Sequence, residues 1–380
     1  MRRGALRIRI GDGGELEIVD PGLAEAALLS GIDRNFAIRS APLWGFTRPR
    51  LLGLRTQATP VNAAAADALA LRDLWAVHDA ALGRWRENPN GGGDAVAYAP
   101  VATLSLLDLK RLIARRLLGA CVLCARRCGV DRAAGRTGLC GLSAEAYVFD
   151  HFVHIAEEPQ INPSFVLNLR GCALRCRGCQ QSGLLDTRGA AHERLVPDLW
   201  GELALDGARS LSLVGGNPDE SLAAILDFLA AAPEDFALPI VWNNHAYMSG
   251  EVIRLLQGVV DVYVPDLKFG AETCAQPYTR VQRYAAVAQE AIGHLLEHGV
   301  PVIVRILVLP GHGACCHVPS LAWLAAHDSE NLFVSLRGHY APDWRITARD
   351  GPLAGRVAKE ELDAVTAVAR AHGLRLVGES

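Results

Sequence analysis

Three cysteines lie close together near the middle of the chain, at Cys172, Cys176 and Cys179. Their C-x3-C-x2-C spacing places three soft thiolate ligands on one loop. A 4Fe-4S cube has four irons, so three protein ligands leave one iron open to a second molecule, as a reactive cluster requires. A structural zinc site instead needs four closed ligands, commonly two C-x2-C pairs. The spacing therefore predicts an open iron–sulfur cluster.

A second group of cysteines lies upstream, in a stretch that also holds several glycines. Its members are Cys121, Cys124, Cys128 and Cys140. Four thiols make a closed site, so zinc and a fully ligated 4Fe-4S cluster both fit, and spacing does not choose between them. We therefore expect a second metal here. The cysteines that remain have no ligand spacing among themselves and are assigned no role: Cys274, Cys315 and Cys316.

Other residues that could bind a ligand follow apolar runs farther along the chain. Gly215 and Gly216 end one run, and their missing side chains let backbone polar groups approach a ligand closely. Arg305 lies inside an apolar run, where it needs a partner to offset the loss of hydration. Polar residues follow two other runs: a plain turn is the alternative to a binding site at Asn243, and a surface ion pair is the alternative at Asp266 and Lys268.

The elements that position these residues follow a repeated pattern from residue 165 onward. Short β-branched runs predict strands at 165–169, 210–214, 239–242, 260–264, 302–309 and 332–336. Amphipathic stretches between them predict helices at 197–205, 222–231, 252–257, 279–298 and 319–326. Alternating strands and helices imply an α/β fold with a parallel sheet and with functional groups at the carboxyl ends of the strands. Periodicity alone leaves open an open doubly wound sheet and a complete or partial barrel.

The first part of the chain has a different organisation. Residues 5–19 alternate in period two around a glycine-rich turn, which predicts a β-hairpin. Helical spacing runs over residues 61–87, and the Asn-Pro-Asn-Gly-Gly-Gly segment that follows ends the helix and suggests a domain boundary. A further helix is expected from Ser105, which forms a capping box with Asp108, to about Leu118.

With these motifs, the chain resembles the radical S-adenosylmethionine (SAM) superfamily, and within it the subgroup similar to pyruvate formate-lyase activating enzymes. The resemblance covers roughly residues 105–345. It rests on the C-x3-C-x2-C loop, on residues 215–218 (Gly-Gly-Asn-Pro) and on residues 266–268 (Asp-Leu-Lys). Asn217 stands where the superfamily has an acid, and Gly178 stands where it usually has an aromatic residue. Ribonucleotide reductase activases are similar in having glycine at the latter position.

The resemblance implies a set of site residues and a fold. The cluster would be held by Cys172, Cys176 and Cys179, and SAM would be bound by Gly215, Gly216, Asn217, Asn243, Asp266, Lys268, Arg305 and His339. Residues 151–380 would form a partial (βα)6 TIM-like barrel. A small cysteine-rich metal-binding module at 101–150 and an N-terminal α+β extension at 1–100, of unknown role, would precede the barrel.

The implied activity is the reductive cleavage of SAM. A flavodoxin- or ferredoxin-like protein would reduce the 4Fe-4S cluster, and SAM would be cleaved to methionine and a 5'-deoxyadenosyl radical that abstracts hydrogen from a protein or small-molecule substrate. The chain would then be an oxidoreductase of the activating-enzyme type. The alternative from a different class is a zinc-stabilised, non-catalytic binding protein built on a degenerate radical SAM barrel.

Composition narrows the choice of partners and of compartment. The chain has 38 basic and 41 acidic residues, a net charge of −3, and no basic block of the kind that attracts nucleic acid. Neither a signal peptide nor a membrane-spanning run of about 18 apolar residues is visible. We therefore expect a cytoplasmic protein, in which clustered cysteines bind metal rather than form a disulfide framework.

Overall fold

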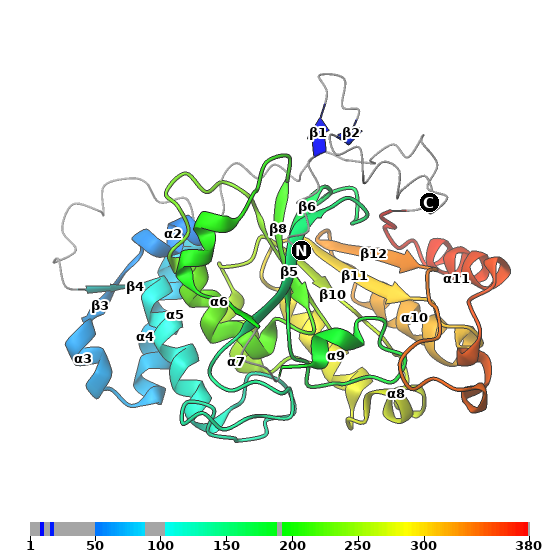
Figure 1. Ribbon diagram of the computed structural model, residues 1–380, viewed down its shortest axis with the longest axis horizontal. Helices are drawn as coiled ribbons and strands as arrows, with labels where there is room; N and C mark the ends of the chain where they lie inside the picture. The colour runs from blue at the N-terminus through cyan, green and yellow to red at the C-terminus, as the bar shows by residue number, and fades with distance from the viewer. Residues whose placement is uncertain (1–7, 11–15, 19–49, 88–102, 188–191, 379–380) are drawn as a thin grey trace.

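An eight-stranded sheet forms the centre of the protein. The computed structural model describes residues 8–10, 16–18, 50–87, 103–187 and 192–378. Six strands of the sheet are parallel and lie side by side in chain order: β6 (Ser164–Leu169), β8 (Ser210–Gly215), β9 (Ile240–Asn244), β10 (Val262–Pro265), β11 (Val302–Leu307) and β12 (Leu332–Arg337). They coincide with the six strands predicted from the sequence. The α/β fold with a parallel sheet is thus confirmed (Figure 1).

Two antiparallel strands extend the sheet beyond β6. β5 (Tyr147–His154) pairs with β6, and the short strand β7 (Glu193–Arg194) pairs with β5. Neither strand was predicted from the sequence. β5 alternates only weakly in burial and leaves Phe149 and Phe152 exposed, so its pattern is not that of a buried parallel strand.

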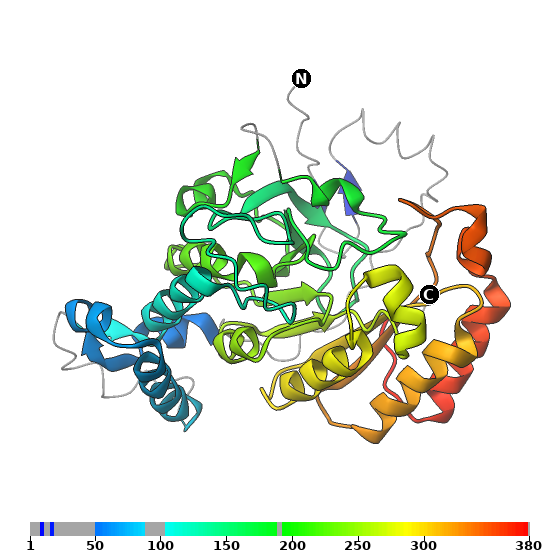
Figure 2. The ribbon, with the colours of Figure 1, turned by 90° about the horizontal axis from the view of Figure 1, so that it is seen from below.

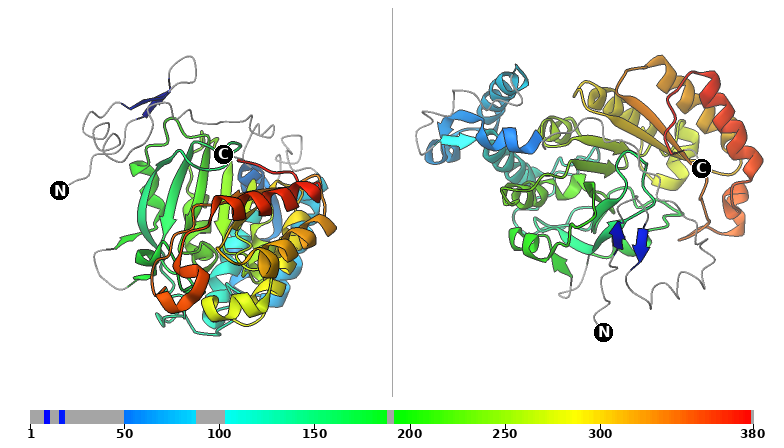
Figure 3. Two further views of the ribbon diagram at one scale, coloured as in Figure 1. Left: turned by 90° about the vertical axis from the view of Figure 1, so that its right-hand side faces the viewer. Right: turned by 90° about the horizontal axis from the view of Figure 1, so that it is seen from above.

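Helices cover one side of the sheet. The connections between strands contribute α6 (Leu222–Ala230), α7 (Gly250–Leu256), α8 (Glu272–Thr279), α9 (Tyr284–Leu296) and α10 (Val318–Ala326), and α11 (Lys359–Ala371) follows β12. In the left view of Figure 3 the strands form one layer, and the orange and red helices α10 and α11 lie beside it. Right-handed βα crossovers place successive helices on the same face in this way. The apolar faces of these helices and of the strands join in one core cluster.

Two of the helices predicted between the parallel strands differ from the structure. The stretch expected as one helix at 279–298 begins with the end of α8, and α9 then spans Tyr284–Leu296. Arg280 and Arg283 adopt left-handed φ angles of 53° and 58°, which interrupt the helix between them. The segment expected as a helix at 197–205 is instead the 3-10 helix η4 (Pro197–Glu202). The helix α11 was not predicted.

The amino-terminal elements include the expected hairpin, β1 (Ile8–Ile10) and β2 (Leu16–Ile18), which pair antiparallel. They also include α2 (Arg50–Thr56), β3 (Ala58–Asn62), α3 (Ala63–Ala68), α4 (Leu71–Glu87), β4 (Thr103–Ser105) and α5 (Leu106–Leu117). The blue helices α3 and α4 lie at one side of the protein (Figure 1 and Figure 2). Helix α5 packs against both α4 and α6, so it joins this part to the sheet.

The helical stretch predicted over 61–87 is correct at its end but not at its start, because β3 runs to Asn62 and α3 ends at Ala68 before α4 begins. Helix α4 ends at Glu87, and the oxygen of Ser105 caps α5 in a capping box with Asp108. The predicted boundary at the glycine run lies outside the described residues. The division into 1–100, 101–150 and 151–380 stays a prediction, although β3 and β4 pair across residue 100. In the described part of the chain, no helix combines the length and apolar character that crossing a bilayer requires.

Candidate functional site

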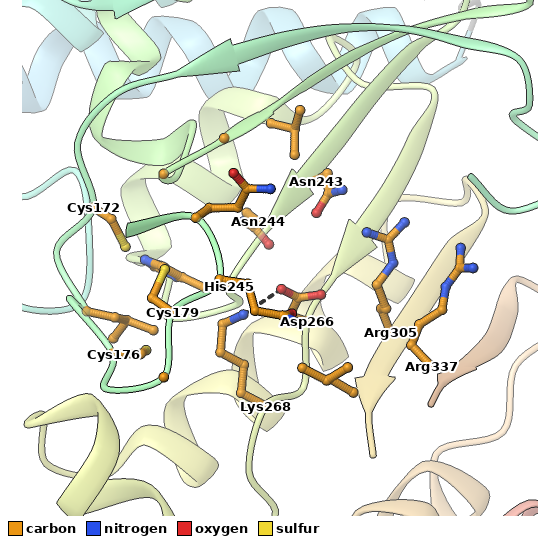
Figure 4. Close-up of a pocket in the computed structure, with 18 of the residues that line it drawn as sticks. Cys172, Cys176, Cys179, Asn243, Asn244, His245, Asp266, Lys268, Arg305 and Arg337 are labelled. Atoms are coloured by element: carbon orange, nitrogen blue, oxygen red, sulfur yellow. Dashed lines mark hydrogen bonds and ion pairs between the residues drawn. The ribbon is translucent and has the colours of Figure 1, made fainter. Parts of the chain in front are cut away.

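A cavity of about 710 Å³ opens at the carboxyl ends of the parallel strands. This volume falls within the range typical of small-molecule sites, roughly 300–1,000 Å³. The cavity is lined by almost all the residues predicted to hold the cluster and SAM: Cys172, Cys176, Cys179, Gly215, Gly216, Asn243, Asp266, Lys268, Arg305 and His339. Figure 4 shows the cysteines at one side, Asp266 and Lys268 in the middle, and Arg305 with Arg337 at the opposite side.

The loop that follows β6 carries the three cysteines and is anchored through its backbone. The N–H of Ala173 donates to the carboxylate of Glu220 (3.0 Å). The N–H groups of Arg177 and Gly178 donate to the carbonyls of Tyr278 and Trp344, both at 2.8 Å. The loop is therefore held from three directions: the segment after β8, helix α8 and the segment after β12. Such anchoring holds the three cysteines in position before a cofactor binds.

The thiols of the loop differ in burial. Cys172 is buried, whereas Cys176 and Cys179 are partly exposed at the cavity. Burial raises the pKa of the Cys176 thiol to about 11, and the ammonium of Lys268 acts in the opposite direction. A bound metal would convert such thiols to thiolates outright. Three thiols on one anchored loop suit the donor preference of an iron–sulfur cluster.

The side chains of the cysteine loop are not arranged in a metal-binding geometry. Within the described ranges, the structure contains no group of three or more His, Cys, Asp or Glu side chains arranged to hold a metal ion. The shared loop and the shared cavity support cluster binding at Cys172, Cys176 and Cys179, which stays a prediction.

Glycines bring the end of β8 directly against the cysteine loop. Gly215 has a left-handed φ of 117°, and a Cβ atom there would overlap the backbone of Leu169. A Cβ atom at Gly216 would overlap the carbonyl group of Gly171. Only glycine permits this close approach of the two backbones. Packing therefore explains the double glycine, which also forms part of the cavity wall.

Asn217 is the one predicted SAM-binding residue that does not line the cavity. It is buried behind the wall, where its amide donates to the carboxylate of Glu220 and its side-chain oxygen accepts the N–H of His245 (3.1 Å). In this arrangement Asn217 orients two neighbours of the site. Direct contact between Asn217 and SAM stays a prediction.

Sequence reasoning missed a buried polar network next to Asn217. Asp219 accepts hydrogen bonds from the indole of Trp242 (2.7 Å) and from the amide of Asn244 (2.9 Å). Glu220 lies 3.5 Å from Nε2 of His245. Burial raises the pKa of Asp219. At Glu220 burial acts in the same direction, but the neighbouring His245 and Asn217 side chains outweigh it and lower the pKa. Two acids directly after the Gly-Gly-Asn-Pro segment were the available signal.

Asp266 and Lys268 form an ion pair of 2.6 Å at the cavity. Burial lowers the pKa of the Lys268 ammonium, but the charge of Asp266 outweighs it, so the pKa is raised and the ammonium is kept. The hydroxyl of Tyr284 accepts the backbone N–H of Lys268 (3.0 Å) and lies 2.9 Å from the carbonyl of Asp266. The loop after β10 therefore presents a fixed cation close to Cys176.

Arg305 faces the cavity but already has carboxylate partners within the chain. Its guanidinium donates to Glu157 (2.7 Å) and twice to Glu158 (2.7 and 3.0 Å). Arg337 adds a second cation 2.8 Å from Glu158, which is fully buried. The two arginines keep the Glu158 carboxylate ionised, because their charges lower its pKa against the effect of burial. Pairing of Arg305 with SAM stays a prediction; Glu157, Glu158 and Arg337 were not assigned to the site from the sequence.

Gly178 occupies the position where an aromatic residue is usual in the superfamily. Its φ of 72° is left-handed and favours glycine. A Cβ atom there would lie 3.1 Å from Ile346 and 3.6 Å from the hydroxyl of Tyr340. Tyr340 itself lines the cavity, so an aromatic side chain from another segment lies beside this position.

The second cysteine group lies in the loop between α5 and β5. Cys121, Cys124 and Cys140 are buried and Cys128 is partly exposed. A Cβ atom at Gly138 would lie 3.3 Å from the sulfur of Cys140 and 3.8 Å from that of Cys128, so both thiols face this glycine. Burial raises the pKa of Cys140 to about 11, with Arg132 acting against it. Metal binding by this group stays a prediction.

Comparison with known proteins finds one relative by sequence. No family model matches the chain. The "Uncharacterized protein MJ0674" of Methanocaldococcus jannaschii is 30% identical over 321 residues, which cover 81% of this chain and 90% of that protein.

Solved structures show weaker likeness. Streptococcus suis SuiB bound to S-adenosylmethionine has 14% identity and a TM-score of 0.41 over 55% of this chain and 48% of its own. A domain of pyruvate-formate lyase-activating enzyme from Bacteroides vulgatus has 15% identity and a TM-score of 0.30, covering 37% of this chain and 80% of its own. The chain thus spans about half of SuiB, and neither likeness carries an argument about activity. The extent of the archaeal match does establish a relationship: the chain belongs to the same family as the M. jannaschii protein MJ0674.

Proposed function

We propose that this chain is a radical SAM enzyme, similar to the activating enzymes of glycyl-radical proteins, whose parallel strands form a partial (βα)6 barrel. The observation that carries the proposal is the cavity at the strand ends. It gathers the C-x3-C-x2-C loop, the double glycine and the Asp-Leu-Lys segment, which lie far apart in the sequence. Residues that match one superfamily in sequence thus share one site, where ligands bind in folds of this class.

The chemistry would come from the cofactors. When bound, a 4Fe-4S cluster and SAM together supply the reductive cleavage of a sulfonium to methionine and a 5'-deoxyadenosyl radical. Cys172, Cys176 and Cys179 would hold the cluster as thiolates. Lys268, whose charge is stabilised by Asp266, offers a cation that offsets part of the negative charge of these thiolates.

The polar cavity wall would orient SAM. Gly215 and Gly216 line the cavity, so their backbone polar groups would lie within reach of SAM. Asn243 at the end of β9 and His339 after β12 offer further polar groups. Arg305 and Arg337 supply positive charge, although Glu157 and Glu158 neutralise it, so a carboxylate ligand would have to share or displace these internal partners.

The buried network behind the wall has a positioning role. Glu220 binds the backbone of Ala173, between the first two cysteines, and Asn217 binds Glu220. Rigid support of this kind holds catalytic ligands in place and helps to exclude water. The proposed substrate is a protein or a small molecule, and the proposed electron donor is flavodoxin- or ferredoxin-like. A second metal, either zinc or a 4Fe-4S cluster, is proposed for Cys121, Cys124, Cys128 and Cys140.

The test is anaerobic reconstitution with iron and sulfide, followed by reduction with dithionite and assay of 5'-deoxyadenosine from added SAM. We expect deoxyadenosine, together with about four irons per chain, or about eight if the upstream group also holds a cluster. The Cys176→Ala variant should lose this activity, whereas a Cys128→Ala control should lose only the upstream metal. Protein that contains zinc alone and forms no deoxyadenosine would instead support a zinc-stabilised binding protein.

A further inference from the structure

The three cysteines without ligand spacing are brought together by the fold. Cys274 lies in α8, and Cys315 and Cys316 lie in η6 (Gly313–His317), a π-helical turn before α10. The sulfur atoms of Cys274 and Cys315 are 3.4 Å apart, although the residues are 41 positions apart in sequence. Two thiols in contact at this separation are not explained by cluster or SAM binding, because neither lines the cavity.

The two contacting thiols differ in access. Cys315 is exposed, and Cys274 is buried with 8% of its surface exposed. The sulfur atoms must approach from 3.4 Å to about 2.05 Å to bond. An accessible thiol next to a second thiol is the arrangement often found in cysteines that undergo thiol–disulfide exchange.

Cys316 also lies beside Cys274, but its surroundings differ from those of Cys315. It is fully buried, and its sulfur accepts the backbone N–H of Gly270 at 2.9 Å. A Cβ atom at Gly270 would overlap the carbonyl of Cys316 and the hydroxyl of Ser320, so the two segments pack tightly here. Cys316 is thus engaged in holding the turn after β10 against η6, and it fixes the distance between the elements that carry the other two thiols.

We propose that Cys274 and Cys315 are a reversible redox pair that closes to a disulfide. The oxidant would be a low-molecular-weight disulfide such as oxidised glutathione. The Cys315 thiolate attacks one glutathione sulfur and releases one reduced glutathione; the Cys274 thiolate then attacks the Cys315 sulfur and releases the second. Both cysteines lose a proton, the protein is oxidised by two electrons and the glutathione disulfide is reduced by two.

The pair joins two segments that build the cavity. Helix α8 follows the loop with Asp266 and Lys268, and η6 follows the end of β11, where Leu307 and Leu309 line the cavity. A disulfide would link these two walls covalently. The inference does not require the cluster or SAM, so it stands or falls separately from the proposed function.

The test uses the full-length protein, purified without oxygen and equilibrated with mixtures of reduced and oxidised glutathione. Free thiols are then blocked with N-ethylmaleimide, and the protein is digested with trypsin and analysed by mass spectrometry without reduction. Cleavage after Lys268 and Arg280 isolates Cys274 in peptide 269–280, and cleavage after Arg305 and Arg337 isolates Cys315 and Cys316 in peptide 306–337. None of the seven predicted metal ligands lies in either peptide.

We expect the two peptides to appear joined, at the sum of their masses less two hydrogens plus one N-ethylmaleimide on Cys316, and to separate again as reduced glutathione increases. The link should persist in Cys316→Ser and disappear in both Cys274→Ser and Cys315→Ser. Oxidised wild-type protein should also unfold about 5 °C or more above the reduced form, because the bond closes a long loop. Peptides that remain separate and blocked at every glutathione ratio, or a link that survives in Cys315→Ser, would overturn the proposal.

Discussion

The backbone N–H of Cys172 donates to the carbonyl of Cys140 at 3.2 Å, so the two cysteine groups meet through a main-chain hydrogen bond. Glu220 lies near both groups: burial raises the pKa of the Cys172 and Cys124 thiols, and the Glu220 carboxylate raises both pKa values further. The upstream group is therefore a structural neighbour of the proposed catalytic loop. Its ligands are nevertheless on a separate loop, so the two sites should load separately.

This separation predicts the outcome of replacing one upstream cysteine. Cys124→Ala should lose the upstream metal and keep the electron paramagnetic resonance spectrum of the reduced cluster at Cys172, Cys176 and Cys179. The shared contact is made by the Cys140 backbone, which the substitution leaves in place. Metal analysis and spectroscopy of the reconstituted variant measure both quantities. Loss of the cluster spectrum would mean that the two sites form one cooperative unit.

A second prediction concerns the ion-pair cluster at the cavity. Arg305→Leu should lower the free energy of unfolding by about 3–5 kcal/mol, because it removes a partner from the fully buried Glu158. The matched control is Arg375→Leu, which breaks an exposed pair with Asp328 and should cost about 1 kcal/mol or less. Urea unfolding of both variants measures the difference. Equal stabilities would show that the Arg305 pairs do not stabilise the fold.

The same variant separates structural and ligand-binding roles. If Arg305 also binds the SAM carboxylate, SAM affinity should fall in Arg305→Leu but not in a Glu157→Gln variant, which leaves the arginine in place with its bonds to Glu158. Isothermal titration calorimetry on folded, cluster-loaded protein measures affinity. Unchanged affinity in Arg305→Leu would leave the arginine with a structural role alone.

The strands could be predicted from the sequence because they are buried on both faces and read as continuous β-branched runs. Val262 and Tyr263, for example, point to opposite faces of β10 and are both buried. Strand β5 was not predicted because its sequence pattern is weak. It lies near the edge of the sheet, and exposed Phe149 alternates with buried Val148 over only a short stretch. Its antiparallel pairing with β6 depends on contacts that local pattern does not contain.

Site residues were predictable where a local motif carried them. The cysteine loop and Asp266 with Lys268 are short motifs, and the structure brings them to one cavity. Glu158 could not be assigned because its role arises from Arg305, which is 147 positions away. Cys274 and Cys315 were given no role for the same reason, since spacing along the chain does not reveal a contact between separate elements.

A third prediction tests the close approach of β8 to the cysteine loop. Gly215→Ala should destabilise the protein by several kcal/mol, roughly the cost of a strained φ plus overlap with the Leu169 backbone. Gly293→Ala is the control, because this glycine lies within α9 with open space around it. The control should raise stability by up to about 1 kcal/mol. Thermal unfolding compares the two, and a harmless Gly215→Ala would contradict the packing described.

The last prediction concerns Lys110, a fully buried lysine in α5. Its ammonium lies 2.9 Å from Nε2 of His78 and 3.4 Å from the carbonyl of Arg254. Burial lowers the pKa of Lys110 from 10.5 to about 7; Arg86 and Arg254 act in the same direction, and Asp79 acts against them. Burial and the nearby Lys110 also lower the pKa of His78 to about 3.

These shifts set the direction of the pH dependence. Between about pH 7 and 10.5 the unfolded chain holds a proton on Lys110 that the folded protein has released, so stability should rise with pH across this window. The rise would reach at most about 5 kcal/mol, at about 1.4 kcal/mol per unit of pKa shift. His78 affects a separate pH range: its lowered pKa means that the free energy of unfolding should fall as pH falls from 6.5 towards 3.

Lys110→Met isolates the lysine, because methionine keeps much of the apolar stem without the charge. The free energy of unfolding, measured in urea from pH 6 to pH 10, should rise more steeply in the wild-type protein than in Lys110→Met. Below pH 6 both proteins should lose stability, since His78 remains in each. Parallel curves between pH 7 and 10 would show that Lys110 keeps its proton in the folded state, which would require the Asp79 carboxylate, rather than burial, to dominate at this site.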